Sequence, residues 1–366
     1  MTTDRNPTVS ICLPVYNGSK YLAEAIDSAL QQTFEDFELI VCDDRSTDGS
    51  VAIAQALTVK DARIKLQVNE GKLGLFENYN RCLSRAHGKY LKLFAQDDLF
   101  DRDLLEQMVA VLDENPKVSL VSCAKKWIDD QGAEIKRIVK FPENEVIKGK
   151  DVILANLILL TNWVGEPSAT MFRATKMGDK FDPAFYHYGD IEYWFRILEN
   201  EYFYYLSSPL CGFRRHEESS TSANLNGLYF AADYFRLGTK YEKYLSELNE
   251  TPEHFGKRAV EMLALELDHL VRNEGLTVSD VISANPRGRM GSEFTETAAF
   301  REVLFHSERR LTSLLEELIA TKNELEHRQA ECTRLWAALN QLTNSVSWKL
   351  TAPLRSVRAK IGPAQP

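Results

Sequence analysis

The sequence predicts an α/β fold, with a doubly wound, mostly parallel sheet and flanking helices. Short β-rich runs alternate with segments of helical period over residues 9–114, and the connections between them are short. Pairs of aspartates follow two of these β-rich runs. Because ligands bind outside the carboxyl ends of the strands in such sheets, the pairs indicate a binding crevice as well as a fold.

The individual elements follow from local patterns. Residues 9–13 are a β-rich run that Pro14 ends, and apolar residues then recur at helical spacing over 21–32. Capping residues over 46–50 precede another helix, and Pro116 stops the last one. The expected strands are 9–13, 37–42, 64–68 and 90–94, and the expected helices are 21–32, 51–57, 78–86 and 104–114.

The regular alternation stops near residue 118. Two strand-like runs within 118–141 flank a turn at 129–132, which predicts a hairpin. Residues 222–290 are rich in helix formers and predict a helical extension, and a linker is expected over 291–299.

A seven-residue repeat beyond the linker predicts a coiled coil over 300–344 and, through it, a homo-oligomer. The repeat comprises Leu304, Leu311, Leu318, Leu325, Cys332 and Leu339. Thr321 and Arg328 interrupt its companion seam, so a helix packed on its own protein is the alternative. Residues 345–366 form a basic amphipathic tail that suits an anionic membrane surface, or else a solvated end of the coiled coil.

Composition indicates a cytoplasmic protein. Of the 366 residues 44% are hydrophobic, yet no apolar stretch approaches the ~20 residues that span a bilayer. The N-terminus lacks the apolar core of a signal peptide. The six cysteines show no C-x-x-C spacing, so we expect neither a zinc site nor a disulfide framework. The net charge of −9 conceals a basic end, because residues 332–366 contain no acid.

Two turns at strand ends carry candidate binding residues. Tyr16, in the turn after the first strand, has a ring that can stack on a flat base, although the turn also reads as an ordinary Pro/Gly loop. Asp43 and Asp44 follow the second strand, and capping of the next helix is as good an explanation for either one alone. Their position at consecutive strand ends favours ligand binding.

The aspartate pair Asp97 and Asp98 follows the apolar run 90–94 and suits a hard divalent cation that carries phosphates. Asp190 opens a later helix, where capping is the alternative role. The cationic run that ends at His216 is able to face a diphosphate or to pair with neighbouring glutamates on the surface.

Together these motifs resemble glycosyltransferase family 2, the inverting enzymes of GT-A type fold. The resemblance covers about the first 220 residues, and we expect a GT-A catalytic domain over 1–221. The matching segments are 14–18, 31–48, 69–74, 78–81, the aspartate pair, 165–168, 189–190 and 215–216. A weaker resemblance of the C-terminal segment is to bacterial surface-polysaccharide glycosyltransferases, such as those of O-antigen synthesis.

The resemblance implies a nucleoside diphosphate sugar as donor and assigns site residues. Pro14, Tyr16 and Asp44 would line the base, Asp97 would meet the ribose or sugar, and Asp98 would hold Mn²⁺ or Mg²⁺ on the diphosphate. Further donor contacts would be Asn17, Lys72, Arg214 and Arg215, with His216 as a second metal ligand, Glu166 on the acceptor side and Asp190 as the catalytic base. Glu166 is equally explained as a structural loop charge. Many members of the family have Glu where this chain has Gly189.

The sequence thus predicts an inverting, metal-assisted glycosyltransferase, with a glycan or lipid-linked glycan as acceptor. A carboxylate such as Asp190 would take the acceptor hydroxyl's proton. Nucleotidyl transfer is a weaker alternative, since no Gly-rich phosphate loop follows the first strand. A non-catalytic coiled-coil scaffold of a glycan-synthesis complex is another. We expect no nucleic-acid partner, and a location in the cytoplasm or on the cytosolic face of the inner membrane.

Overall fold

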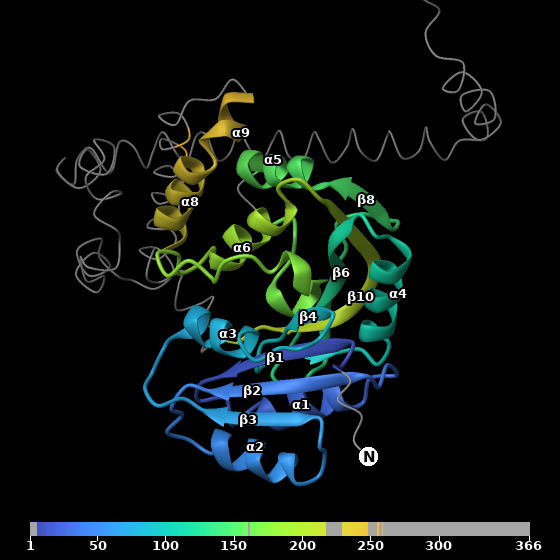
Figure 1. The fold of residues 1–366 in the computed structure, drawn as a ribbon, viewed down its shortest axis with the longest axis vertical. Helices are drawn as coiled ribbons and strands as arrows, with labels where there is room; N and C mark the ends of the chain where they lie inside the picture. The colour runs from blue at the N-terminus through green and yellow to red at the C-terminus, as the bar shows by residue number, and fades with distance from the viewer. Residues whose placement is uncertain (1–5, 160–161, 217–228, 248–254, 256–257, 259–366) are drawn as a thin grey trace, which may run out of the picture. The chain divides into compact units, whose positions relative to one another are not determined.

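A sheet of ten strands, with helices on both faces, organises the part of the chain that the computed structural model describes (Figure 1). That part comprises residues 6–159, 162–216, 229–247, 255 and 258. The strands are β1 (Val9–Val15), β2 (Phe37–Asp43), β3 (Ile64–Val68), β4 (Tyr90–Leu93), β5 (Leu99–Phe100), β6 (Val118–Ile128), β7 (Glu134–Ile138), β8 (Glu145–Lys148), β9 (Thr170–Arg173) and β10 (Tyr202–Arg214). The α-helices are α1 (Leu22–Leu30), α2 (Ser50–Thr58), α3 (Leu75–Leu83), α4 (Leu104–Glu114), α5 (Gly149–Leu159), α6 (Gly189–Leu198), α8 (Tyr229–Lys240) and α9 (Glu242–Glu247).

The first half of the sheet is parallel, as the sequence predicts. β1 lies between β2 and β4, and β3 lies outside β2, with all of these pairings parallel. In the register, Val15 at the end of β1 is opposite Asp43 at the end of β2. The polar residues that follow β1, β2 and β4 therefore meet at one edge of the sheet.

The second half of the sheet is mixed, so the prediction of a mostly parallel sheet is wrong there. β9 runs antiparallel to both β4 and β6, and β5 and β8 run antiparallel to β10. The predicted hairpin is confirmed by the antiparallel pairing of β6 with β7. A hairpin reverses the chain without a crossover helix, which explains why regular strand–helix alternation ends at this point.

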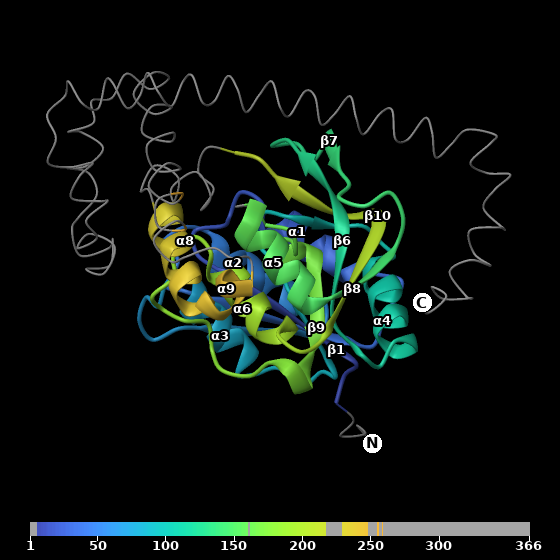
Figure 2. The same cartoon turned by 90° about the horizontal axis from the view of Figure 1, so that it is seen from above.

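Two hydrophobic cores lie on the two faces of the sheet. Alternate residues of β1 divide between them, so that Leu13 belongs to one core and Cys12 to the other. Helices α1 and α4 cover the first core with Ile26 and Leu105, whereas α6 covers the second with the fully buried Trp194. Figures 1 and 2 show α5, α6, α8 and α9 gathered over this second face.

Helices α8 and α9 lie within the predicted extension 222–290 and pack on this domain. The Tyr234 hydroxyl of α8 donates to the Leu157 carbonyl of α5, and the Tyr241 ring meets Phe195 of α6 edge-on, with ring centres 5.0 Å apart. The linker, coiled coil and tail lie outside the described residues, and the domain boundaries remain a prediction. Within the described part of the chain, every helix is too short or too polar to span a membrane.

Candidate active site

The ring of Tyr16 is the exposed aromatic surface at the end of β1. Its backbone N–H donates to Gln96 Oε1 at 2.9 Å, and its carbonyl accepts from Gln96 Nε2 at 3.0 Å. Lys72 Nζ lies 3.8 Å from the ring centre. Because the backbone is fixed and the residue is 39% exposed, the ring offers a flat face for stacking. Pro14 is buried within β1 and shapes the strand end instead of lining a surface.

Asn17 holds the turn after β1 in a left-handed conformation, with φ 48°. Asparagine tolerates this region better than most residues. Its Oδ1 accepts the Thr47 N–H at 2.8 Å, and its own N–H donates to Ser46 Oγ at 2.9 Å. The side chain therefore ties the loop after β1 to the loop after β2.

The adjacent aspartates at the end of β2 have different surroundings. Both oxygens of Asp44 are occupied, because they accept bonds from Asn69 Nδ2 and from the backbone N–H groups of Leu73 and Gly74. Asp43 uses Oδ1 for one backbone N–H, and its buried Oδ2 has no hydrogen-bond partner among the described residues. The structure thus favours Asp43 over Asp44 as the carboxylate that meets a ligand.

The Asp97–Asp98 pair is held by the end of β10. The Arg214 N–H donates to Asp98 Oδ1 at 3.0 Å, and Arg214 Nε donates to the Asp97 carbonyl at 2.8 Å. His216 Nε2 lies 2.9 Å from Asp97 Oδ2. The structure therefore brings Asp97, Asp98, Arg214 and His216 together, although the last two lie far along the chain.

The two predicted arginines are in different environments. The buried Arg214 also donates to the Asp129 carbonyl and to Glu24 Oε2, each at 2.7 Å, so all its contacts hold the protein scaffold. Arg215 is exposed, and its guanidinium lies 4.9 Å from the Trp127 ring centre. Arg214 positions the aspartate pair, and Arg215 is the one of the two that solvent reaches.

Asp98, like Asp43 and Asp44, is a buried carboxyl. Burial, with a further contribution from Asp97, raises the pKa of Asp98 to about 8, although the Arg214 N–H and the nearby Ser168 hydroxyl oppose this. Its buried Oδ2 accepts no hydrogen bond within the described part of the chain. A nearby cation would stabilise the ionised form of such a group.

The residues around Asp98 fit a divalent cation that keeps several non-protein ligands. Among the described residues, no group of three or more His, Cys, Asp or Glu side chains could hold a metal ion by itself. Asp98, with the Asp97–His216 pair beside it, offers carboxylate and imidazole groups. Mg²⁺ typically binds in this way, through one or two carboxylates together with water and phosphate oxygens.

Asp190 lies in the first turn of α6. The Ile191 N–H donates to Asp190 Oδ1 at 2.8 Å. Burial is the main cause that raises the pKa of Asp190 to about 7, and the Glu166 charge raises it further, while the Ile191 N–H and Lys125 lower it. The residue remains partly exposed. A solvent-accessible carboxyl with a pKa near neutrality is suited to general-base chemistry.

Glu166 acts electrostatically on both ends of the site. Its charge raises the pKa of Asp98 and the pKa of Asp190. Burial would raise its own pKa, but Lys125, which pairs with it, and Lys140 lower it overall. Its Oε2 is buried and has no hydrogen-bond partner among the described residues.

The sequence pattern does not single out Lys125 and Lys140. Lys125 lies in β6 directly after seven buried residues, and a lysine at this position of a largely apolar strand is a signal that the sequence does carry. Lys140 follows β7, and its Nζ donates to the Asn162 carbonyl at 2.7 Å. Nothing in its local sequence indicates that burial lowers its pKa to about 8.

Comparison with known proteins identifies the family. Residues 10–176 match the model of the family described as Glycosyl transferase family 2. A protein of Rickettsia typhi, described as an uncharacterized glycosyltransferase, is 31% identical over 246 residues, which cover 66% of this chain and 74% of the relative. The chain therefore belongs to glycosyltransferase family 2.

Solved structures share the fold. Residues 1–349 of S. aureus TarS, crystallised in complex with UDP-GlcNAc, superpose with a TM-score of 0.53 at 19% identity, covering 73% of each chain. The mannosyltransferase PcManGT of Pyrobaculum calidifontis, in complex with GDP-Man and Mn²⁺, gives a TM-score of 0.51 at 16% identity, covering 88% of this chain and 87% of that one. These similarities confirm the predicted GT-A type fold.

Proposed function

We propose that the protein transfers a sugar from a nucleoside diphosphate sugar to a hydroxyl of a glycan or lipid-linked glycan, with inversion at the transferred carbon. The observation that carries this proposal is the partly exposed Asp190 carboxyl, whose pKa burial raises to about 7 and which shares with Asp98 the electrostatic influence of Glu166. The donor class is supported by two proteins of the same fold, whose structures contain UDP-GlcNAc and GDP-Man.

The donor would lie along the carboxyl edge of the parallel strands. The Tyr16 ring, with Lys72 above it, would stack on the base, and the buried Asp43 Oδ2 would accept from the base or ribose. Asp44 would act indirectly, by holding the loop that carries Lys72. Asp97 would meet the ribose or sugar, as its position next to Asp98 suggests.

The diphosphate would lie beside Asp98. Asp98 and His216 would hold Mn²⁺ or Mg²⁺, and the bound cation would neutralise charge on the leaving diphosphate. Asp97 orients His216 through their 2.9 Å contact, and Arg214 fixes both aspartates from behind. Arg215 is placed to attract the anionic donor from solvent.

The transfer would be a single displacement. The Asp190 carboxylate takes the proton of the acceptor hydroxyl while that oxygen bonds to C1 of the sugar, and the bond from C1 to the diphosphate oxygen breaks with its electron pair leaving on the diphosphate. Attack from the face opposite the leaving group inverts the configuration at C1. Glu166 and Lys125 would face the acceptor, because their charges act on Asp190.

The test is the Asp190→Asn variant assayed with donor sugars and a glycan acceptor. We expect the transfer rate to fall about 10³-fold, which is within the usual contribution of a general base, while donor affinity measured by calorimetry is unchanged. Asp179→Asn is the matched control, because it removes an exposed carboxylate from the segment before α6 and should leave the rate unchanged. A near-normal rate for Asp190→Asn, or a product with retained configuration by NMR, would contradict the mechanism.

A further inference from the structure

Asp233, in helix α8, makes an unusual set of contacts for a surface helix of an extension. The residue is fully buried. Its Oδ2 accepts three consecutive backbone N–H groups, those of Tyr186 at 2.7 Å, His187 at 2.5 Å and Tyr188 at 3.0 Å. Its Oδ1 lies 2.8 Å from Arg236 Nη1. One carboxylate thus satisfies three neighbouring donors of a single loop.

The three N–H groups belong to the segment that leads into Asp190. Tyr188 is the N-cap residue of α6, and Gly189 and Asp190 are the first two residues of that helix. The conformation of this segment decides where the Asp190 carboxylate points, since the helix begins directly after it. The carboxylate of Asp233 therefore holds the backbone from which Asp190 projects.

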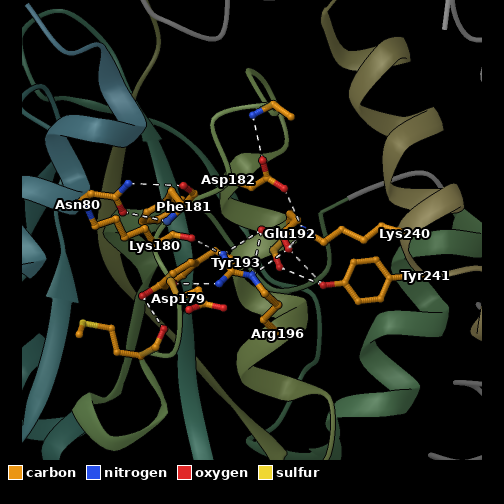
Figure 3. Close-up of polar contacts among 12 residues, drawn as sticks. Asn80, Asp179, Lys180, Phe181, Asp182, Glu192, Tyr193, Arg196, Lys240 and Tyr241 are labelled. Atoms are coloured by element: carbon orange, nitrogen blue, oxygen red, sulfur yellow. Dashed lines mark hydrogen bonds and ion pairs between the residues drawn. The ribbon is translucent and has the colours of Figure 1, made fainter. Parts of the chain in front are cut away.

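Lys240 of the same helix contacts Asp182, which precedes Asp190 in the chain, and Glu192, which follows it (Figure 3). Lys240 Nζ, at the end of α8, lies 2.9 Å from Glu192 Oε1 in α6 and 2.9 Å from Asp182 Oδ2 in the preceding segment. Glu192 is fully buried and also pairs with Arg196 at 2.9 Å. Helix α8 thus contacts the chain before Asp190 and the helix after it through charged groups.

The segment has little freedom on its other side. A Cβ atom added at Gly189 would lie 2.5 Å from the Phe76 ring of α3. That ring stacks on Phe181 with ring centres 5.3 Å apart, so displacing it would disturb this contact. The start of α6 is therefore confined between α3 on one side and α8 on the other.

The chemistry of the contact favours positioning over simple docking. Tyr234 and Leu237 already attach α8 to the domain through apolar contacts in the core. Burying a carboxylate is costly unless its oxygens are fully bonded. A buried carboxylate with three N–H donors and a guanidinium instead specifies one conformation of the loop, because any other leaves donors or charge unsatisfied.

We propose that Asp233 is a positioning residue for sugar transfer, which holds segment 186–188 so that Asp190 is aimed at the acceptor hydroxyl. This inference rests on the proposed role of Asp190. It makes the helical extension part of the catalytic apparatus, although none of its described residues needs to touch the substrate.

The experiment compares Asp233→Asn and Asp233→Ala in the full-length chain. Both variants should lower kcat, by about 10-fold for Asn and about 100-fold for Ala, because small misplacements of a catalytic group are costly. The donor KM and the calorimetric donor Kd should stay within about twofold of wild type. Hydrogen exchange at the amides of 186–188 should be slow in the wild type and at least about 10-fold faster in both variants.

We call the contacts of Asp233 with the backbone of 186–188 the clamp. The matched control is Leu245→Ala, which removes a buried side chain of α9 that takes no part in the clamp. It should lower Tm while leaving kcat, and exchange at 186–188, unchanged. A kcat loss in Leu245→Ala equal to that of Asp233→Asn at equal loss of Tm would overturn positioning in favour of general stability. If Asp233→Ala does not fold, Asp233→Asn and Arg236→Gln, which removes the guanidinium partner, carry the test.

The outcomes separate this inference from the proposed function. If Asp190→Asn retains transfer, the role of Asp190 is wrong, whatever the clamp does. If Asp190→Asn is inactive but the Asp233 variants keep wild-type kcat, the positioning role is wrong and the base assignment stands. Fast exchange at 186–188 in the wild type would refute the clamp without any activity measurement.

Discussion

The proposed donor side and the proposed base side of the site hold their carboxylates in different ways. On the donor side, Asp43 and Asp44 lie at the end of β2, and the hydrogen-bond donors to their side chains lie within 30 residues of them along the chain. On the base side, Asp190 begins a helix whose preceding segment is held by Asp233, 45 to 47 residues further along the chain. The comparison teaches that contacts within the parallel half of the sheet hold Asp43 and Asp44, whereas a contact from helix α8, near the C-terminal end of the described residues, holds the segment that leads into Asp190.

The first test of this difference compares a substitution of Asp44 with a substitution of Asp43. Asp44→Ala removes the acceptor of two backbone N–H groups and of one of the two Asn69 amide N–H groups, the other of which donates to Asn78 Oδ1, so we expect the free energy of unfolding to fall by about 3 kcal/mol. Asp43→Asn keeps the size of the side chain and should leave stability near wild type while weakening donor binding about 10-fold. Denaturant unfolding and donor calorimetry measure the two effects. Equal loss of stability in both variants would contradict the division of roles.

A smaller change addresses the base side. Gly189→Ala places a methyl group against the Phe76 ring, and the ring or the start of α6 must shift. We expect a loss of about 1 to 3 kcal/mol in stability, as for other overpacked sites, and a fall in kcat with little change in donor Kd. Gly71→Ala is a suitable control, because a Cβ there meets no atom within 4 Å. Normal kcat in Gly189→Ala would show that the base tolerates displacement.

The smallest perturbation is a change of pH. If Asp190 acts as the proposed general base, it must be ionised, and burial raises its pKa to about 7, so kcat should fall as pH drops below about 7 and level off above it. The pKa is higher in the folded protein than in the unfolded chain, so ionisation of Asp190 costs stability as pH rises from about 4 to about 7. Asp190→Asn should therefore raise Tm relative to wild type more at about pH 8 than at about pH 5. A kcat profile that stays flat down to about pH 5 would contradict the raised pKa.

The parallel half of the fold was predictable because its information is local. Strands at 9–13, 37–42, 64–68 and 90–94 all correspond to observed strands, and the carboxylates after them meet at the predicted edge. The mixed half was not predictable, because β9, which lies between β4 and β6 in the sheet, comes from a segment without a clear β pattern. Antiparallel insertion of this kind depends on which partners are available, and single-strand patterns do not encode that.

The same distinction between local and distant information explains which residues of the site could be predicted from the sequence. Asp98 and Asp190 stand out in the sequence because acids at a strand end and a helix start are conspicuous. The sequence could not separate Asp43 from Asp44, since neighbours share every local feature and differ only in the bonds that distant loops make. Asp233 could not be found at all, because it looks like an ordinary acid on an amphipathic helix until its three amide partners are seen.

The contact between α8 and segment 186–188 has a consequence for exchanging parts between members of the family. A chimera joined just after β10 would inherit every carboxylate that the sequence makes conspicuous, but it would receive its helix partner from another protein. The residues proposed to bind the nucleotide would remain intact. The orientation of Asp190 would depend on whether the protein that contributes the C-terminal part has an acid at the position of Asp233. A junction placed before β9, which moves the loop and the helix together, preserves the pair.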